Sequence, residues 1–284
     1  MKVNDKCLLC VVNQAIKVAN MTKVADKEAL LREVFLYLSK ADFKTSTPEM
    51  IGEIFEMIKG YTNPDPYKET RKYYNSLFLK LLPELEEKIT RSENPFLLAI
   101  RYAIVGNIID FNPIHNTLLE DIYHYLDNIQ QMELAIDHSK ELMEEVVSAK
   151  RLLYLGDNCG EICLDKLLLQ QIKKINPDIN LIFAVRGKPV VNDSIEEDAY
   201  FVGIDHYAQI IDNGDSSIGT VLKRTSQEFR EVYENADLVI SKGQANYECL
   251  SEEKKKIFFL LVTKCEVNAN DIGVEEKRMI CMRK

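Results

Sequence analysis

The sequence has no tryptophan, only four histidines and no long apolar run. A membrane-spanning helix needs roughly 18 or more consecutive apolar residues, and an uninterrupted run such as Ile257–Val262 is far shorter. The apolar segment Cys7–Val12 is likewise too short for a secretory signal, and the polar residues Asn13 and Gln14 follow it. The sequence therefore predicts a cytoplasmic protein with no membrane partner.

An excess of positive charge is also missing. The chain has 36 lysines and arginines against 45 aspartates and glutamates, which gives a net charge of -9. The acidic excess is spread over both halves of the chain. Because a nucleic-acid surface usually shows clustered lysines and arginines, we expect no nucleic-acid partner.

The chain contains seven cysteines, but we expect no disulfide framework. A chain of 284 residues can bury a sizeable core without covalent cross-links. Cys7-Leu8-Leu9-Cys10 is a single C-x-x-C pair, whereas a structural zinc site needs four ligands. Packing on a helix is the favoured interpretation of this pair, and a metal or redox role is the alternative.

Common catalytic motifs are missing as well. The histidines form no H-E-x-x-H pattern, and the chain has neither a Walker A loop nor a G-x-S-x-G elbow. These absences argue against a zinc peptidase, a P-loop nucleotidase and an α/β-hydrolase.

The two halves of the chain have different apolar patterns. Residues 1–150 carry apolar side chains at three- and four-residue spacing, as in Ala29–Leu38 and Met50–Ile58, which predicts amphipathic helices. In residues 151–284, short apolar runs alternate with helical stretches, which predicts a mostly parallel sheet with helices on both faces. We therefore predict an α/β fold, with an all-helical N-terminal domain over residues 1–150 and a catalytic domain over residues 151–284.

The elements of the second half can be placed one by one. Most of the strand runs are continuously apolar, which is typical of strands covered on both faces. Strands are expected at Arg151–Leu155, Leu181–Val185, Gln209–Ile211, Leu238–Ile240, Ile257–Val262 and Met279–Met282. Helices are expected between them at Glu161–Lys174, at Ile218–Asn235 and after Asn246.

Two oxygen-bearing side chains follow the first expected strand. Asp157 and Asn158 lie between Gly156 and Gly160, just before a helix is expected to begin. Carboxylate and amide oxygens suit a hard divalent cation such as Mg²⁺ or Mn²⁺. The alternative interpretation is that either side chain only caps the helix, because Asp and Asn are common caps. The spacing alone does not decide between a metal site and a helix cap.

The second expected strand is followed by Arg186 and then by Asn192 and Asp193. An arginine can hold a phosphate through two parallel hydrogen bonds, and the other two side chains add oxygen ligands. A helix cap is again the alternative interpretation of Asp193.

The loop after the fourth expected strand contains Lys242 and Asn246. From this position a lysine can reach an anion, although a solvated lysine on the surface is the commoner case. In open α/β sheets, ligands bind at the carboxyl ends of the strands. Because polar, glycine-containing loops follow four strands in succession, we expect them to form one active site.

Taken together, these segments resemble the signature of the damage-control phosphatases, also called acidic-residue-methyltransferase-like proteins, in their short prokaryotic-type subgroup. The resemblance runs over essentially the whole chain. The segments that carry it are Gly156–Glu161, Arg186-Gly187, Asn192-Asp193, Lys242–Glu248, Cys7–Cys10, Asp65–Tyr67 and Gly106–Asp110.

The resemblance implies a Rossmann-like α/β core with a helical N-terminal part packed on it. It also implies a divalent metal, such as Mg, Mn, Co or Ni, bound by Asp157, Asn158 and Asp193. The implied activity is phosphatase action on small phosphorylated metabolites, such as sugar phosphates or damaged cofactors.

On this basis we expect metal-assisted hydrolysis of phosphomonoesters, with Asp157, Asp193 and Lys242 in catalytic roles. Lys242, helped by Arg186, is expected to balance the charge of the phosphate. Contacts with the substrate are expected from Asn107, Glu161, Arg186, Asn192 and Asn246.

Some alternatives stay open at this point. Asp157 could instead be a nucleophile that forms an aspartyl phosphate. A carboxyl methyltransferase that uses S-adenosylmethionine and a non-catalytic metal- or metabolite-binding module are the other functional classes. The sequence leaves the oligomeric state undetermined.

Overall fold

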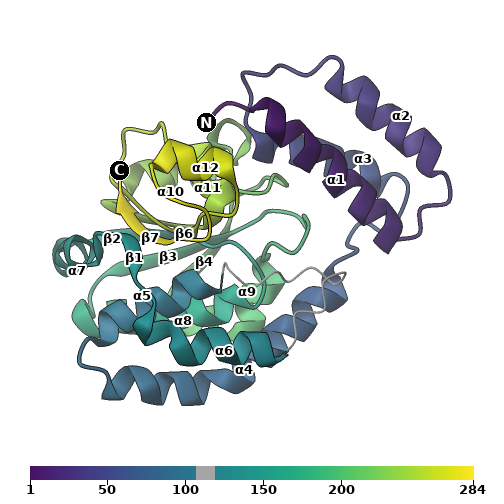
Figure 1. Cartoon of the computed structure of the whole chain (residues 1–284). Helices are drawn as coiled ribbons and strands as arrows, with labels where there is room; N and C mark the ends of the chain where they lie inside the picture. Colours follow the sequence, from purple (N-terminus) through teal and green to yellow (C-terminus); the bar gives the residue numbers. More distant parts are fainter. Residues whose placement is uncertain (107–118) are drawn as a thin grey trace.

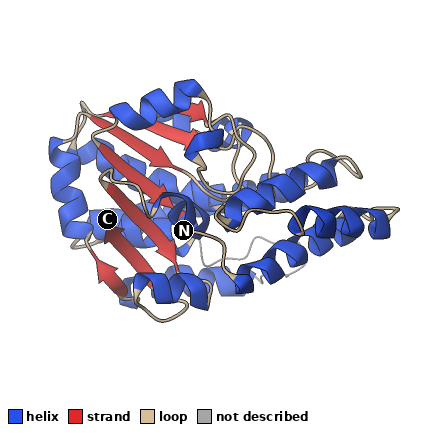
Figure 2. Ribbon diagram, turned by 90° about the horizontal axis from the view of Figure 1, so that it is seen from above, coloured by secondary structure: helices blue, strands red, loops and turns tan. Residues whose placement is uncertain are grey.

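The computed structural model describes residues 1–106 and 119–284, in which a seven-stranded sheet is covered by helices on both faces (Figures 1 and 2). None of the helices described is both long and apolar enough to cross a bilayer. The strands are β1 (Leu134–Asp137), β2 (Arg151–Leu155), β3 (Asn180–Val185), β4 (Gln209–Asp212), β5 (Leu238–Lys242), β6 (Ile257–Val262) and β7 (Met279–Arg283). The helices are α1 (Asp5–Met21), α2 (Lys27–Leu38), α3 (Thr47–Lys59), α4 (Lys68–Arg91), α5 (Pro95–Val105), α6 (Leu119–Asn128), α7 (Ser139–Ser148), α8 (Glu161–Ile175), α9 (Glu196–Val202), α10 (Gln227–Asn235), α11 (Gly243–Leu250) and α12 (Glu266–Ile272).

The sheet has the strand order β1-β7-β6-β5-β2-β3-β4. The strands from β6 to β4 in this order all run parallel to their neighbours. At the other end, β7 is antiparallel to β6, and β1 is parallel to β7. The carboxyl ends of β2–β6 therefore lie at one edge of the sheet, and the predicted α/β fold with a mostly parallel sheet is confirmed.

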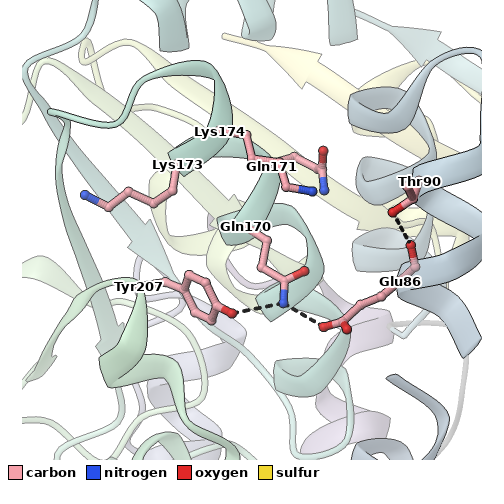
Figure 3. A pocket seen from close by; sticks show the side chains of 7 residues that line it. All are labelled: Glu86, Thr90, Gln170, Gln171, Lys173, Lys174 and Tyr207. Carbon is pink, nitrogen blue, oxygen red and sulfur yellow. Dashed lines mark hydrogen bonds between the residues drawn. The ribbon is translucent and has the colours of Figure 1, made fainter. Parts of the chain in front are cut away.

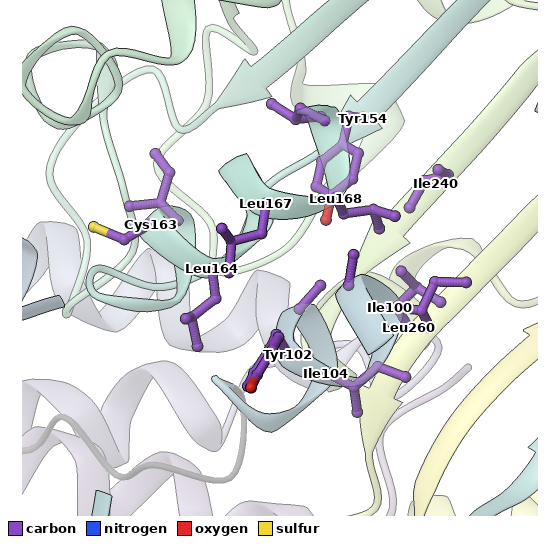
Figure 4. Packing of buried hydrophobic residues seen from close by; sticks show 14 of the residues in the cluster. Ile100, Tyr102, Ile104, Tyr154, Cys163, Leu164, Leu167, Leu168, Ile240 and Leu260 are labelled. Atoms are coloured by element: carbon purple, nitrogen blue, oxygen red, sulfur yellow. The ribbon is translucent and has the colours of Figure 1, made fainter. Parts of the chain in front are cut away.

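Each central strand contributes to two apolar cores, because successive side chains point to opposite faces of a sheet. In β2, Leu152 and Tyr154 belong to the core that also contains α4, α5 and α8. Leu153 and Leu155 belong to the core that contains α10 and α11. Figure 4 shows Tyr154 close to side chains of α8 on the first face. Full burial of a leucine stabilises the fold by about 1.5–3 kcal/mol, so both faces hold the sheet in place.

The first three helices pack mainly on one another. Val18 of α1, Val34 of α2 and Phe55 of α3 share one apolar cluster, and these helices lie to one side of the sheet (Figure 1). The same cluster includes Val190, from the loop that follows β3. The three helices are thereby attached beside the carboxyl edge of the sheet.

Two expected elements differ from the structure. Helices alone were expected over residues 1–150, but β1 lies there and pairs with β7. A strand of four residues that gains its partner from the end of the chain leaves little pattern in the sequence. The predicted helix Ile218–Asn235 is wrong over its first part, because Gly219 has a φ of 82° and Ser226 caps α10 through a hydrogen bond from the Phe229 N–H.

The division of the chain at residue 150 stays a prediction. The largest apolar core contains Phe78 and Ile100 from the first half together with Leu168 and Ile240 from the second (Figure 4 shows the last three). The helices α4 and α5 are thus part of the layer that covers the sheet.

Candidate active site

The loops after β2 and β3 are joined at the carboxyl edge of the sheet. The Ser194 N–H donates to the Asp157 carbonyl at 2.8 Å, and Asn158 forms an antiparallel bridge with Asp193. These backbone contacts bring together three side chains from two separate loops. They are the residues that the sequence indicated as metal ligands.

Arg186 lies among the acidic side chains and is only 2% exposed. Its Nε donates to Asp193 Oδ2 at 2.7 Å, and its Nη2 lies 3.4 Å from Asp157 Oδ1. Burial and the charge of Asp193 raise the pKa of Asp157 to about 8. Burial also raises the pKa of Asp193, and the guanidinium opposes this effect. Arg186 therefore orients the acidic pair, and two of its donors are already engaged there.

The amide of Asn158 lies between acidic side chains. Its Nδ2 donates to Asp157 Oδ2 at 2.7 Å and to Glu161 Oε2 at 3.1 Å. Its Oδ1 accepts a hydrogen bond from Asn192 Nδ2 at 3.0 Å. The positively polarised NH₂ group of Asn158 thus lies between the carboxylates of Asp157 and Glu161. A bound cation requires the same kind of environment.

This donor set fits a hard cation whose coordination shell is completed by other ligands. In the described part of the chain, no three His, Cys, Asp or Glu side chains are grouped so that they could hold a metal by themselves. Mg²⁺ is usually held by one or two carboxylates together with water and substrate phosphate. Asp157, Asp193 and the amide of Asn158 match that pattern.

Lys242 does not have the environment expected of a phosphate ligand. Its side chain is completely buried, and its Nζ donates to Glu161 Oε1 at 2.6 Å and to Asp165. Asp165 also accepts a hydrogen bond from the Tyr154 hydroxyl, and burial raises its pKa to about 7. Lys242 is thus the positive centre of a buried acidic cluster at the beginning of α8.

Asn246 connects three strand-end loops and is fully buried. Its Nδ2 donates to the carbonyls of Lys242 and Gly156, and its Oδ1 accepts from the Thr220 hydroxyl at 2.8 Å. Its polar atoms are engaged within the protein, which indicates a positioning role. Asn107, the other asparagine expected to contact the substrate, lies outside the described residues.

A cavity of about 340 Å³ opens beside the acidic pair. Asp157, Asn158, Asn192 and Asp193 form part of its wall, whereas Arg186, Glu161, Lys242 and Asn246 are not among the residues that line it. The remaining wall comes from α1, α3, α11 and the segments after β4 and β6. Cys7 and Cys10 lie on this wall, so the C-x-x-C pair faces the site and does not only pack between helices.

A network that the sequence did not reveal supports the site from behind. Asn75 of α4 accepts a hydrogen bond from the Gly160 N–H at 2.7 Å and donates to Asp198 of α9 at 3.1 Å. Arg71 donates to the same carboxylate at 2.8 Å and forms two hydrogen bonds with Asp65. The Asp65–Tyr67 segment is one of those that carry the family resemblance. The contact between Asn75 and Gly160, however, depends on how α4 packs.

Gly187 is required by a close approach of two backbones. A Cβ atom at this position would lie 2.6 Å from the Gly214 backbone, so the loops after β3 and β4 could not stay in contact. We therefore expect Gly187→Ala to lower the free energy of unfolding by about 1–3 kcal/mol. Urea denaturation measures this change, and an unchanged midpoint would contradict the close contact.

A second pocket, of about 410 Å³, lies between α4 and α8 (Figure 3). Gln170 Nε2 donates to Glu86 at 2.7 Å and to the Tyr207 hydroxyl at 3.2 Å. This pocket contains no pair of convergent carboxylates, and it is lined by side chains away from the strand ends. The cavity beside Asp157 is therefore the better candidate for the active site.

The fold and the site together define a Rossmann-like α/β protein with an acidic site at the carboxyl ends of its strands. The family model described as "Damage-control phosphatase ARMT1-like domain" matches residues 3–280, and the chain belongs to this family. Family membership supports a phosphatase that acts on damaged metabolites.

Individual relatives agree with this assignment. The chain is 33% identical over 289 residues to the damage-control phosphatase PH1575 of Pyrococcus horikoshii, with 100% of this chain and 98% of that protein covered. It is 36% identical over 219 residues to a damage-control phosphatase of Archaeoglobus fulgidus, with 76% and 75% covered. The crystal structure of the DUF89 family protein of P. horikoshii superposes with a TM-score of 0.90 at 33% identity, covering 100% of this chain and 99% of the other.

Proposed function

We propose that this protein is a metal-dependent phosphatase that hydrolyses small phosphorylated metabolites. The observation that carries the proposal is the convergence of Asp157, Asn158 and Asp193 on the wall of one cavity at the carboxyl edge of the sheet. The cavity volume of about 340 Å³ is at the small end of ligand pockets, in keeping with a sugar phosphate or a compound of similar size.

The two carboxylates would hold a divalent cation such as Mg²⁺, Mn²⁺, Co²⁺ or Ni²⁺, together with the amide of Asn158. When bound, the cation supplies the charge that polarises a phosphoryl oxygen. Phosphoryl transfer depends mainly on positioning and charge neutralisation, so few protein groups are needed. Arg186 keeps the carboxylates oriented, and Asn192 holds the amide of Asn158 in place.

Lys242 contributes to this site from the interior. Its ion pair with Glu161 fixes the first turn of α8, and Glu161 in turn accepts a hydrogen bond from Asn158. The carbonyl of Lys242 also holds the side chain of Asn246. We therefore assign Lys242 a positioning role in the proposed reaction.

The proposal is tested with purified protein that has been stripped of metal. The protein is assayed with p-nitrophenyl phosphate and a panel of sugar phosphates, and Mg²⁺, Mn²⁺, Co²⁺ and Ni²⁺ are added back separately. We expect turnover only with added metal. An absence of turnover with every metal and every phosphate ester would rule out the proposal.

A further inference from the structure

Val191 has a backbone conformation that a branched side chain rarely adopts. Its φ is 42°, in the left-handed region, where the Cβ atom of a valine lies too close to the backbone. Glycine is the usual residue in such a position, because it has no Cβ atom. The other two described residues with a positive φ that are not glycine, Lys23 and Lys277, are unbranched and exposed. A strained conformation that persists beside a candidate active site points to a functional requirement.

Val191 is the second residue of a tight turn that leads into the acidic site. The Asp193 N–H donates to the Val190 carbonyl at 3.1 Å, which closes the turn. Turns with a positive φ at their second position normally have glycine, asparagine or aspartate there. The turn is fixed on both sides, because Val190 is completely buried in the apolar cluster of α1, α2 and α3 and the Asn192 carbonyl accepts a hydrogen bond from the Cys159 N–H at 2.9 Å. These neighbours hold Val191 in its strained conformation.

The side chain of Val191 forms part of the cavity wall. It lines the cavity together with Asn192 and Asp193, and Ile51 of α3 and Ile218 line it as well. Ile51 belongs to the apolar cluster of α1, α2 and α3, and both Val191 and Ile218 pack against that cluster. Val191 is only half-buried, so part of its side chain stays accessible from the cavity. The wall therefore has an apolar patch next to the acidic pair.

An apolar patch suits one part of a phosphate ester only. It binds neither a divalent cation nor a phosphate group, because both need polar or charged partners. The carbon skeleton of the alcohol part, by contrast, gains from this contact, since burial of apolar surface is favourable. Such a wall also selects by size, because packed side chains make room for extra atoms only at the cost of strain.

We propose that Val191 determines the specificity of the site by contacting the alcohol part of the phosphate ester and limiting its size. This role rests on the proposed phosphatase function. The substrates are then compact monoesters whose alcohol part has an apolar face beside the phosphate. The need for this contact accounts for a valine at a turn position that suits glycine.

The test compares the natural protein with Val191→Gly and Val191→Ile, using phenyl phosphate and the bulkier naphthyl phosphate with the metal that supports turnover. Glycine fits the same backbone conformation but removes the contact, so Val191→Gly should raise the KM for phenyl phosphate about 3- to 10-fold. The space that opens should favour the larger ester, so the ratio of kcat/KM for naphthyl phosphate to that for phenyl phosphate should rise about tenfold. Val191→Ile keeps the branched Cβ and adds one methylene group, and it should lower the same ratio.

Lys23→Gly is the matched control for the change in backbone freedom. Lys23 also has a positive φ, but it is exposed and is not among the residues that line the cavity, so the KM of both esters should stay unchanged. The affinity for Mn²⁺, measured by calorimetry, should stay within about twofold in Val191→Gly, because glycine can keep the turn that leads to Asp193. A loss of Mn²⁺ affinity with an unchanged ratio of the two esters would show that Val191 only forms the turn, and would overturn the proposal. If Val191→Gly does not fold, the ratio measured with Val191→Ile decides the question.

Binding of phenylphosphonate and naphthylphosphonate, which are not hydrolysed, separates the role of Val191 from the phosphatase function. If the natural protein turns over no ester but binds phenylphosphonate in the presence of Mg²⁺, the phosphatase function fails, and a changed preference between the two phosphonates in Val191→Gly still supports the role of Val191. If turnover occurs and neither substitution changes the preference between the esters, that role is wrong and the phosphatase function stands. A natural protein that neither hydrolyses the esters nor binds the phosphonates would contradict both.

Discussion

Replacement of Asp157 or Asp193 by asparagine is expected to lower metal-dependent turnover about 10³-fold. Each substitution keeps the size of the side chain and removes one of the two charges that would hold the cation. Both carboxylates lie on the cavity wall, and Arg186 cannot replace either of them because it has the same sign as the metal. The rate is measured with p-nitrophenyl phosphate at saturating metal, and metal affinity is measured separately by calorimetry.

The fold should survive these changes, which makes the loss of rate interpretable. Burial and the neighbouring charge of Asp193 raise the pKa of Asp157 to about 8, so the ionised carboxylate is destabilising in the absence of a cation. Because the folded protein holds this proton more tightly than the unfolded chain, the contribution of Asp157 to stability falls as the pH rises from about 4 towards 8. Above that range, in EDTA, Asp157→Asn should melt no lower than the natural protein.

The control for both variants is Asp178→Asn, which changes an exposed carboxylate in the turn before β3. It should leave turnover and metal affinity unchanged. Folded Asp157→Asn and Asp193→Asn proteins that keep turnover close to the natural rate would show that the two residues are helix caps or loop supports, the alternative that the sequence left open.

Lys242→Met is expected to lower the free energy of unfolding by about 3–5 kcal/mol, because it leaves two buried carboxylates without their counter-charge. Lys242, Glu161 and Asp165 are all completely buried. The effect should be larger at pH 8 than at pH 5. Burial raises the pKa of Asp165 to about 7 even beside the lysine, so at pH 5 this carboxyl is largely protonated and needs the ammonium less. Urea denaturation at the two pH values measures the difference.

Lys256→Met provides the matched comparison. Lys256 Nζ lies 2.6 Å from Glu145, the same distance as that between Lys242 and Glu161, but both partners are partly exposed. Its removal should cost at most about 1 kcal/mol. If Lys242→Met were as stable as Lys256→Met and lost only its turnover, Lys242 would act on the substrate, as first expected from its place at a strand end.

Much of the fold follows from local patterns. The runs Arg151–Leu155 and Ile257–Val262 were expected as strands and have those bounds in the structure, because continuous apolar segments of this length can be buried on both faces of a sheet. By contrast, β1 depends on pairing with β7, a segment far away in the chain, and the antiparallel direction of β7 depends on how the connection from β6 turns back. Such pairing leaves no periodic signal in either segment.

The same distinction applies to the site. By itself, the sequence determined that Asp157, Asn158 and Asp193 meet, because each follows a strand of one parallel sheet and the carboxyl ends of such strands share an edge. Only the tertiary structure decided the environment of Lys242. Lys242 is the last residue of β5, and the alternation of side chains along the strand directs it to the face that α8 covers, where it meets Glu161 and Asp165.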